Sequence, residues 1–142
     1  MPMYTSYLSC LPDSDSACMC SQALGPTDPA DAPPNSLRGQ IAAQWATLGL
    51  PAACDVGDNG MHASASPLEA LAERTNWLQM SIVNDAFGRA LLNAGISESL
   101  IKTWSVDPQV SFDGKKCSLF DLVEDLDSSE CIAKLLEIAK QN

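Results

Sequence analysis

The longest run of helical periodicity in the chain lies between Ser66 and Gly95. Apolar side chains recur there at alternating steps of three and four, which aligns them as a seam along one side of a helix. Ser66 suits a cap, Pro67 suits the first turn, Glu69 completes a capping box with Ser66, and Gly95 suits the end. The sequence therefore predicts one long helix, whose seam comprises Leu68, Leu71, Thr75, Leu78 and Ile82.

This seam stops in the second half of the predicted helix. Asp85 and Arg89 take its next two positions, while the apolar stripe continues through Ala86 and Leu91. We therefore expect the second half to pack in a globular core. The first half has two interpretations, contact with a partner helix or packing within the chain itself. Trp77 lies off the seam, and the candidate interface residues are Leu68, Leu71, Thr75, Trp77, Leu78 and Ile82.

Three shorter helices and one β-ribbon are predicted after residue 95. Each helix begins at a serine that can cap it and carries apolar side chains on one face. The caps are Ser97, Ser118 and, for the last helix, Ser128 or Ser129. The dipeptide Asp113-Gly114 is a strong hairpin signal and predicts a β-ribbon between residues 104 and 117. We expect residues 66–142 to form a small, mainly helical domain.

Residues 1–65 differ from the rest in composition, because eight of the nine prolines lie in the first 67 residues. Proline removes a backbone donor and pushes its predecessor toward extended geometry, so this segment is predicted to be an extended arm. One short helix is expected at about residues 36–48. The arm is either a disordered tail around that helix, or it takes its order from the helical domain or from another chain, since it has few apolar side chains.

The chain has 142 residues and a net charge of −10. This length suits one domain, or a smaller domain with an arm. The acidic balance argues against nucleic acid or an anionic membrane surface as a partner, since both are themselves negatively charged. The sequence contains no apolar run near the ~20 residues of a spanning helix, and its N-terminus does not look like an export signal.

Six cysteines and one histidine raise three possibilities: a zinc site, disulfides or simple thiols. The spacing of the first cysteines lacks the paired C-x2-C pattern that forms structural zinc sites, so no metal is predicted. We expect thiols, as in a reducing compartment, and we expect Cys117 and Cys131 to be small buried groups. We expect His62 to be a solvated loop residue. The other residues considered as zinc ligands are Cys10, Cys18, Cys20 and Cys54.

The sequence contains no combination of nucleophile, base and orienting group that would predict an enzyme. The motifs G-x-S-x-G, H-E-x-x-H and the phosphate-binding loop are absent from it. The segment Asp113–Lys116 fits a hairpin tip better than a phosphate cradle. We therefore predict a protein with no catalytic activity and no cofactor.

Residues 64–82, SASPLEALAERTNWLQMSI, resemble a segment of bacteriophage virion proteins, particularly tail-fibre and baseplate-associated chains. In that family a small-residue or proline lead-in precedes a helix of the type L-x-x-L-x-x-R-T-x-x-L. The resemblance implies a helix that associates with copies of itself, and preceding residues that attach the chain to a particle. The matching residues are Pro67, Leu68, Leu71, Arg74, Thr75, Trp77 and Leu78.

The chain departs from the fibre pattern, because it closes with short helices instead of repeated β-structure and contains six cysteines. The resemblance therefore implies membership of a virion-like assembly more than a receptor-binding fibre. We expect a minor structural component of a phage virion, such as a tail, baseplate, fibre-attachment or head-accessory protein, assembled in the host cytoplasm. Its expected partners are copies of itself and other virion proteins. The alternatives are a small secreted disulfide-stabilised protein and an intracellular acidic inhibitor or regulator of one protein.

Overall fold

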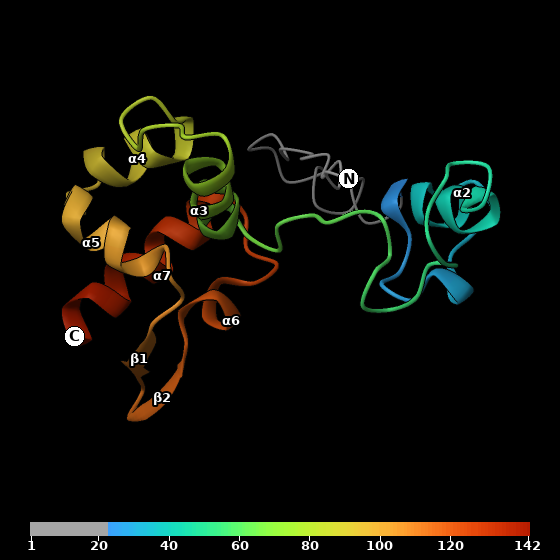
Figure 1. Ribbon diagram of the computed structural model, residues 1–142. Coiled ribbons are helices and arrows are strands. Elements are labelled where there is room, and N and C mark those ends of the chain that lie inside the picture. Colours follow the sequence, from blue (N-terminus) through green and yellow to red (C-terminus); the bar gives the residue numbers. More distant parts are fainter. Residues whose placement is uncertain (1–22) are drawn as a thin grey trace. The chain divides into compact units, whose positions relative to one another are not determined.

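The computed structural model describes residues 23–142 (Figure 1). They fall into two compact units, residues 23–63 and residues 64–142, each with buried residues of its own. This division lies close to the change in composition near residue 65. The prediction of a mainly helical chain with one β-ribbon is confirmed.

In its described residues the first unit contains the 3-10 helix η1 (Pro29–Asp31) and the α-helix α2 (Leu37–Gln44). Ser36 caps α2 by accepting a hydrogen bond from the backbone of Gly39, as the sequence predicted. The helix is shorter than the expected 36–48, and turns continue the chain to residue 49.

Polar contacts close this first unit on itself. The Arg38 guanidinium donates to the carbonyl of Gly25 at 2.6 Å and to that of Met61 at 3.0 Å. Asn59 donates to the carbonyl of Thr27 at 3.1 Å and is 4% exposed. These long-range polar contacts were not predicted, because the segment has few apolar side chains and no local pattern indicates which polar groups meet. Those of Arg38 join both ends of the segment to α2.

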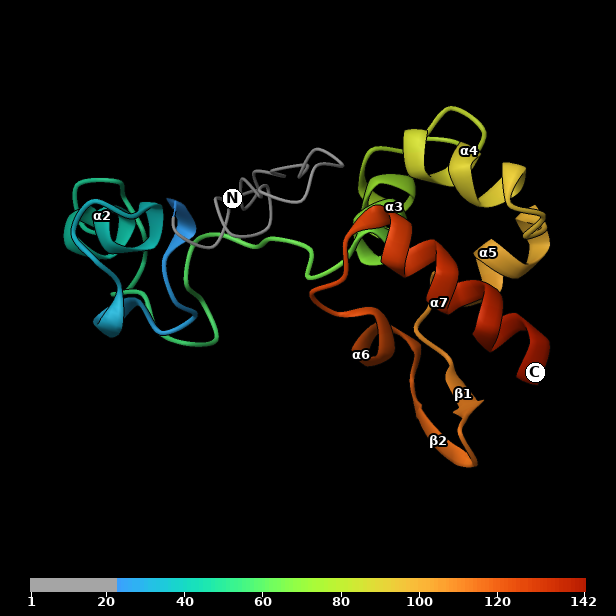
Figure 2. The ribbon, with the colours of Figure 1, turned by 180° about the vertical axis from the view of Figure 1, so that it is seen from behind.

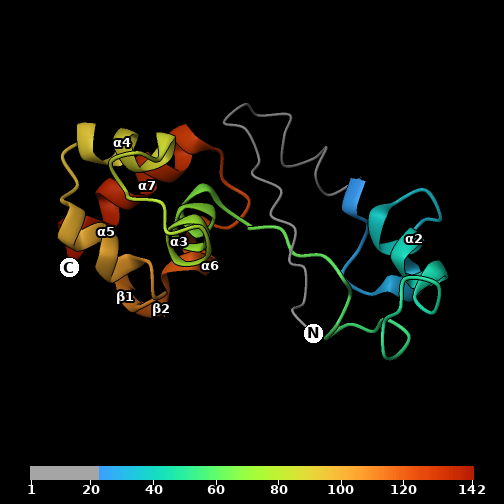
Figure 3. The ribbon, with the colours of Figure 1, turned by 45° about the horizontal axis from the view of Figure 1, so that its top comes forward.

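The second unit packs five helices and a hairpin around one apolar core. The elements are α3 (Pro67–Trp77), α4 (Ala86–Asn93), α5 (Glu98–Trp104), β1 (Gln109–Phe112), β2 (Lys115–Ser118), α6 (Leu119–Val123) and α7 (Ser128–Gln141). Helix α7 contacts α3, α4, α6 and β1, and α3 also contacts α6 (Figures 2 and 3). The fully buried side chains that join these helices include Leu68, Leu71, Leu91, Ile101, Leu119, Leu135 and Ile138.

The single helix predicted over Ser66–Gly95 is wrong, because residues 78–85 form a loop between α3 and α4. Gln79 has φ of +54°, which is left-handed backbone and ends α3. Asp85 then caps α4, since its carboxylate accepts hydrogen bonds from the amides of Phe87 and Gly88. The polar residue that interrupts the apolar seam is thus the start of a new helix.

The remaining helix starts follow the predicted caps at Ser66, Ser97 and Ser118. Two details differ. Glu69 does not complete a capping box with Ser66, because its carboxylate accepts from the amide of Ala65 at 2.5 Å. Helix α7 is capped by Asp127 and not by Ser128 or Ser129, and Asp127 forms a full capping box with Glu130.

The β-ribbon is confirmed as an antiparallel hairpin with Val110 opposite Cys117. Asp113 and Gly114 have φ of +50° and +76°, the paired left-handed geometry that a two-residue hairpin turn requires. The amino group of Lys134 on α7 lies 3.9 Å from the centre of the Phe112 ring, so a cation–π contact ties this strand to the helix.

Candidate functional site

The six candidate interface residues divide into a buried set and an exposed set. Leu68 and Leu71 are fully buried and Ile82 is 5% exposed, so these three pack in the core of the second unit. Thr75 is partly buried, and its hydroxyl donates to the carbonyl of Ala72. Of the two interpretations left open for the seam, the structure therefore uses internal packing for its buried positions.

Trp77 and Leu78 make up the exposed set. The side chains are 62% and 53% exposed at the end of α3. Val106, which follows α5, is 79% exposed. A large aromatic side chain displayed next to other apolar groups is typical of a contact surface, because its burial by a partner removes much apolar area from water.

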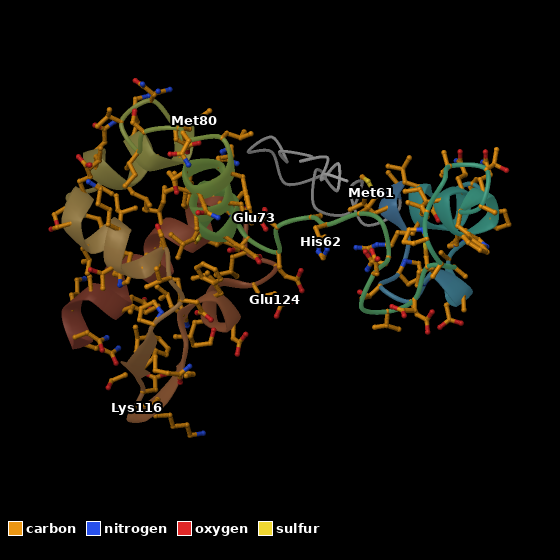
Figure 4. The ribbon with its side chains drawn as sticks, in the orientation of Figure 1. Met61, His62, Glu73, Met80, Lys116 and Glu124 are labelled. Carbon is orange, nitrogen blue, oxygen red and sulfur yellow. The ribbon has the colours of Figure 1, made fainter. Side chains whose placement is uncertain are left out.

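Trp77 borders a depression of about 500 Å³ in the second unit, which we call the Trp77 depression. It is formed by α3, the residues after α5, and α6. Its apolar lining comprises Ala72, Trp77, Val106 and Phe120, and its acidic lining comprises Glu69 and Glu73. Figure 4 labels Glu73 on α3 and Glu124 beyond α6.

The acidic side of the Trp77 depression carries uncompensated negative charge. Partial burial raises the pKa of Glu69 above its ordinary 4.5, and repulsion from Glu73, Glu124 and Asp107 adds to this, against the hydrogen bond from the amide of Ala65. Among the described residues that line the depression, none is basic. A bound cation would relieve this repulsion.

Arg74, the basic residue of α3, does not pair with the glutamates of the depression. The Nε of Arg74 lies 2.7 Å from Oδ2 of Asp85, and the two side chains are 15% and 3% exposed. Burial by itself would raise the pKa of Asp85, but the hydrogen bond from Arg74 and those from the amides of Gly88 and Phe87 hold it below its ordinary 3.8. Arg74 therefore neutralises Asp85 and not the glutamates of the depression.

Backbone hydrogen bonds close the end of α3 at Trp77. The carbonyl of Arg74 accepts hydrogen bonds from the amides of Leu78 and Met80, which closes the last turn of α3 directly around Trp77.

No family model, curated protein or solved structure matches this chain. Its function is therefore inferred from the Trp77 depression and from the charge of the chain.

Residues 23–142 contain no group of three or more histidine, cysteine or acidic side chains placed to hold a metal ion. His62 is exposed, and it lies in the first unit. Cys10, Cys18 and Cys20, considered above as zinc ligands, lie outside the described residues.

None of the helices in the described part is both long enough and apolar enough to cross a membrane.

Cys54, Cys117 and Cys131 are unbridged among the described residues, and Cys117, which was expected to be buried, is only partly so. Cys131 is fully buried, and burial raises its pKa to about 12.

Because the thiolate is the reactive form, iodoacetamide at pH 8 is expected to leave Cys131 unmodified in the folded protein. In denaturant it should alkylate readily. Peptide mass spectrometry checks this, and rapid labelling of Cys131 in the folded state would contradict its burial.

Proposed function

We propose that this protein is a non-catalytic interaction component that binds another protein through the Trp77 depression, as part of a multi-chain particle such as a phage virion. The observation that carries the proposal is a 62% exposed tryptophan at the end of α3, where the backbone amides of Leu78 and Met80 both donate to the carbonyl of Arg74. Tryptophan is among the residues that contribute most to protein–protein contacts when a partner covers them.

The hydrogen-bonded backbone on both sides of Trp77 supports binding. A partner that meets a preorganised side chain loses less conformational entropy than one that must order a mobile loop. The hydrogen bonds from Leu78 and Met80 to Arg74 fix the backbone on the C-terminal side of Trp77, while α3 fixes it on the other side.

The setting in a virion is supported by the resemblance of residues 64–82 to tail-fibre and baseplate-associated chains. That stretch includes all of α3 and ends at Ile82, so it contains the whole α3 side of the Trp77 depression. An intracellular inhibitor or regulator of one protein is the second candidate, which the same depression and the net charge of −10 favour.

Size fractionation of the native source tests the proposal, with the chain detected by its own peptides. The chain is expected in a complex much larger than its own 15.1 kDa. Trp77→Ala should release it from that complex, because truncating a central aromatic contact typically weakens binding by more than about 2 kcal/mol. Leu48→Ala is the matched control, since Leu48 is 56% exposed in the first unit.

Two results would contradict this function. One is elution of the unaltered chain at the size of a single molecule. The other is a complex that Trp77→Ala leaves intact while the variant remains folded by circular dichroism.

A further inference from the structure

We propose that the Trp77 depression receives a cationic helix, in which two Lys or Arg residues one turn apart are followed by an aliphatic residue one turn further on. This proposal rests on the proposed function and specifies the chemistry of the partner. It is drawn from the charges and spacing along the outer face of α3.

Glu69, Glu73 and Trp77 are spaced four residues apart, so they lie in a line along one face of α3. All three border the depression. Successive members are about 6 Å apart, because four residues of an α-helix rise by that amount. A partner helix that lies along this line meets two carboxylates and then an indole ring.

Two like charges at this spacing are unfavourable for an isolated helix. Here the repulsion is reinforced by Glu124 and Asp107, which contribute to the raised pKa of Glu69. Lys or Arg side chains of a partner at the same spacing pair with both glutamates and remove this repulsion. The partner predicted by charge is therefore a cation pair one helical turn apart.

The apolar part of the depression predicts the third contact. Ala72 and Phe120 line it together with the exposed side chains of Trp77 and Val106. An aliphatic side chain placed there is removed from water together with the indole ring and the valine methyl groups. A purely charged partner leaves this area exposed, so a segment that combines both properties fits better.

A second copy of the chain does not supply this pattern from residues 23–142. Lys134 and Lys140 stand six residues apart on α7, and Lys134 already covers the Phe112 ring. Lys102 is paired with Glu98 at 2.6 Å. Arg38, Arg74 and Arg89 each lie more than one helical turn from any other Lys or Arg. Lys115 and Lys116 are adjacent on β2, where they point to opposite faces of the strand. The partner is therefore a different chain.

The test uses the full-length protein and a synthetic alanine-based helical peptide with the pattern Leu-x3-Lys-x3-Lys-x3-Leu, which reads the same in both directions. Isothermal titration calorimetry should detect binding of this peptide. The same peptide with Glu in place of both Lys residues should not bind measurably.

Two double variants separate local charge from net charge. Glu69→Gln with Glu73→Gln should weaken peptide binding by about tenfold, because both ion pairs with the peptide are lost. Glutamine keeps an acceptor for the amide of Ala65 and for the hydroxyl of Ser64, so the fold is retained. The matched control, Glu98→Gln with Glu137→Gln, removes the same charge elsewhere and should change binding by less than about twofold.

The proposal is overturned if the unaltered protein does not bind the Lys peptide, if the Glu peptide binds equally well, or if both double variants weaken binding alike. These results leave the proposed function standing when Trp77→Ala still releases the chain from its native complex. Sedimentation of the chain alone adds one further outcome. A dimer that Trp77→Ala dissociates would identify a second copy as the occupant and would also overturn the proposal.

Discussion

Replacing Asp85 with asparagine is expected to lower the free energy of unfolding of the second unit by about 3 kcal/mol. The substitution leaves the largely buried guanidinium of Arg74 without its anion, and the unpaired charge stays in a poorly hydrated place. It also weakens the cap of α4, because an amide oxygen accepts hydrogen bonds from Phe87 and Gly88 less strongly than a carboxylate does. Urea denaturation followed by circular dichroism measures the loss.

The control for this prediction is Glu98→Gln, which breaks the exposed Glu98–Lys102 pair of α5. Exposed pairs at this spacing contribute little, so the expected change is within about 0.5 kcal/mol. Equal losses in the two variants would contradict the special role of the buried pair.

The contribution of Asp85 to the free energy of unfolding should also depend on pH. The pKa of Asp85 is lowered in the folded protein, so the unfolded chain binds the proton more tightly. The contribution is therefore complete above the ordinary carboxyl value of 3.8 and is lost as the pH falls through the lower, folded value. The difference in stability between the unaltered protein and Asp85→Asn should be constant near pH 7 and shrink below about pH 3.8.

Gly88→Ala is expected to destabilise the second unit by about 3 kcal/mol, although alanine favours a helix interior over glycine by about 1 kcal/mol. A Cβ at position 88 would overlap the backbone oxygen of Ile82, because the loop before α4 lies directly against this turn of the helix. The loop must move to make room, and it carries Asp85. Thermal and urea unfolding both report the change.

Gly95→Ala is the comparison for that variant. Gly95 has φ of +93°, and no neighbouring atom lies within 4 Å of the point that an alanine Cβ would occupy, so only backbone strain of about 1 kcal/mol is expected. A stabilising effect of Gly88→Ala would contradict the close packing of residues 78–85 against α4.

The parts of the fold predicted correctly are those specified by neighbouring residues. Ser97 and Ser118 cap the helices that directly follow them, and Asp113-Gly114 forms the turn between two adjacent strands. Such signals act within a few residues, so a sequence pattern contains all of the information they need.

The prediction of one long helix failed because the break in that helix depends on a contact between residues that are not neighbours in the sequence. Residues 78–85 contain no glycine or proline, and the signals at Ser66 and Gly95 are both correct as a start and an end. The break is stabilised by Arg74 and Asp85, eleven residues apart. The only sign of it in the sequence was a carboxylate at a position where the seam required an apolar side chain.

The surface proposed to bind a partner was partly predictable. Trp77 was selected because it lies off the apolar seam, and the spacing of Glu69, Glu73 and Trp77 can be read from the sequence. The presence of Val106 and Phe120 in this surface could not be predicted, because it depends on how α6 and the residues after α5 pack beside α3. Leu68, Leu71 and Ile82 share the helical pattern of an interface, but the burial that makes them core residues depends on α7 and its neighbours.

Site-specific photo-crosslinking tests the central claim most directly. A benzophenone amino acid replaces Val106, which borders the Trp77 depression, or Val56, which is 56% exposed in the first unit. In the native source, the residue at position 106 should form a discrete adduct with one other protein, and the residue at position 56 should not. Adducts at neither position, or the same adducts at both, would contradict binding through the Trp77 depression.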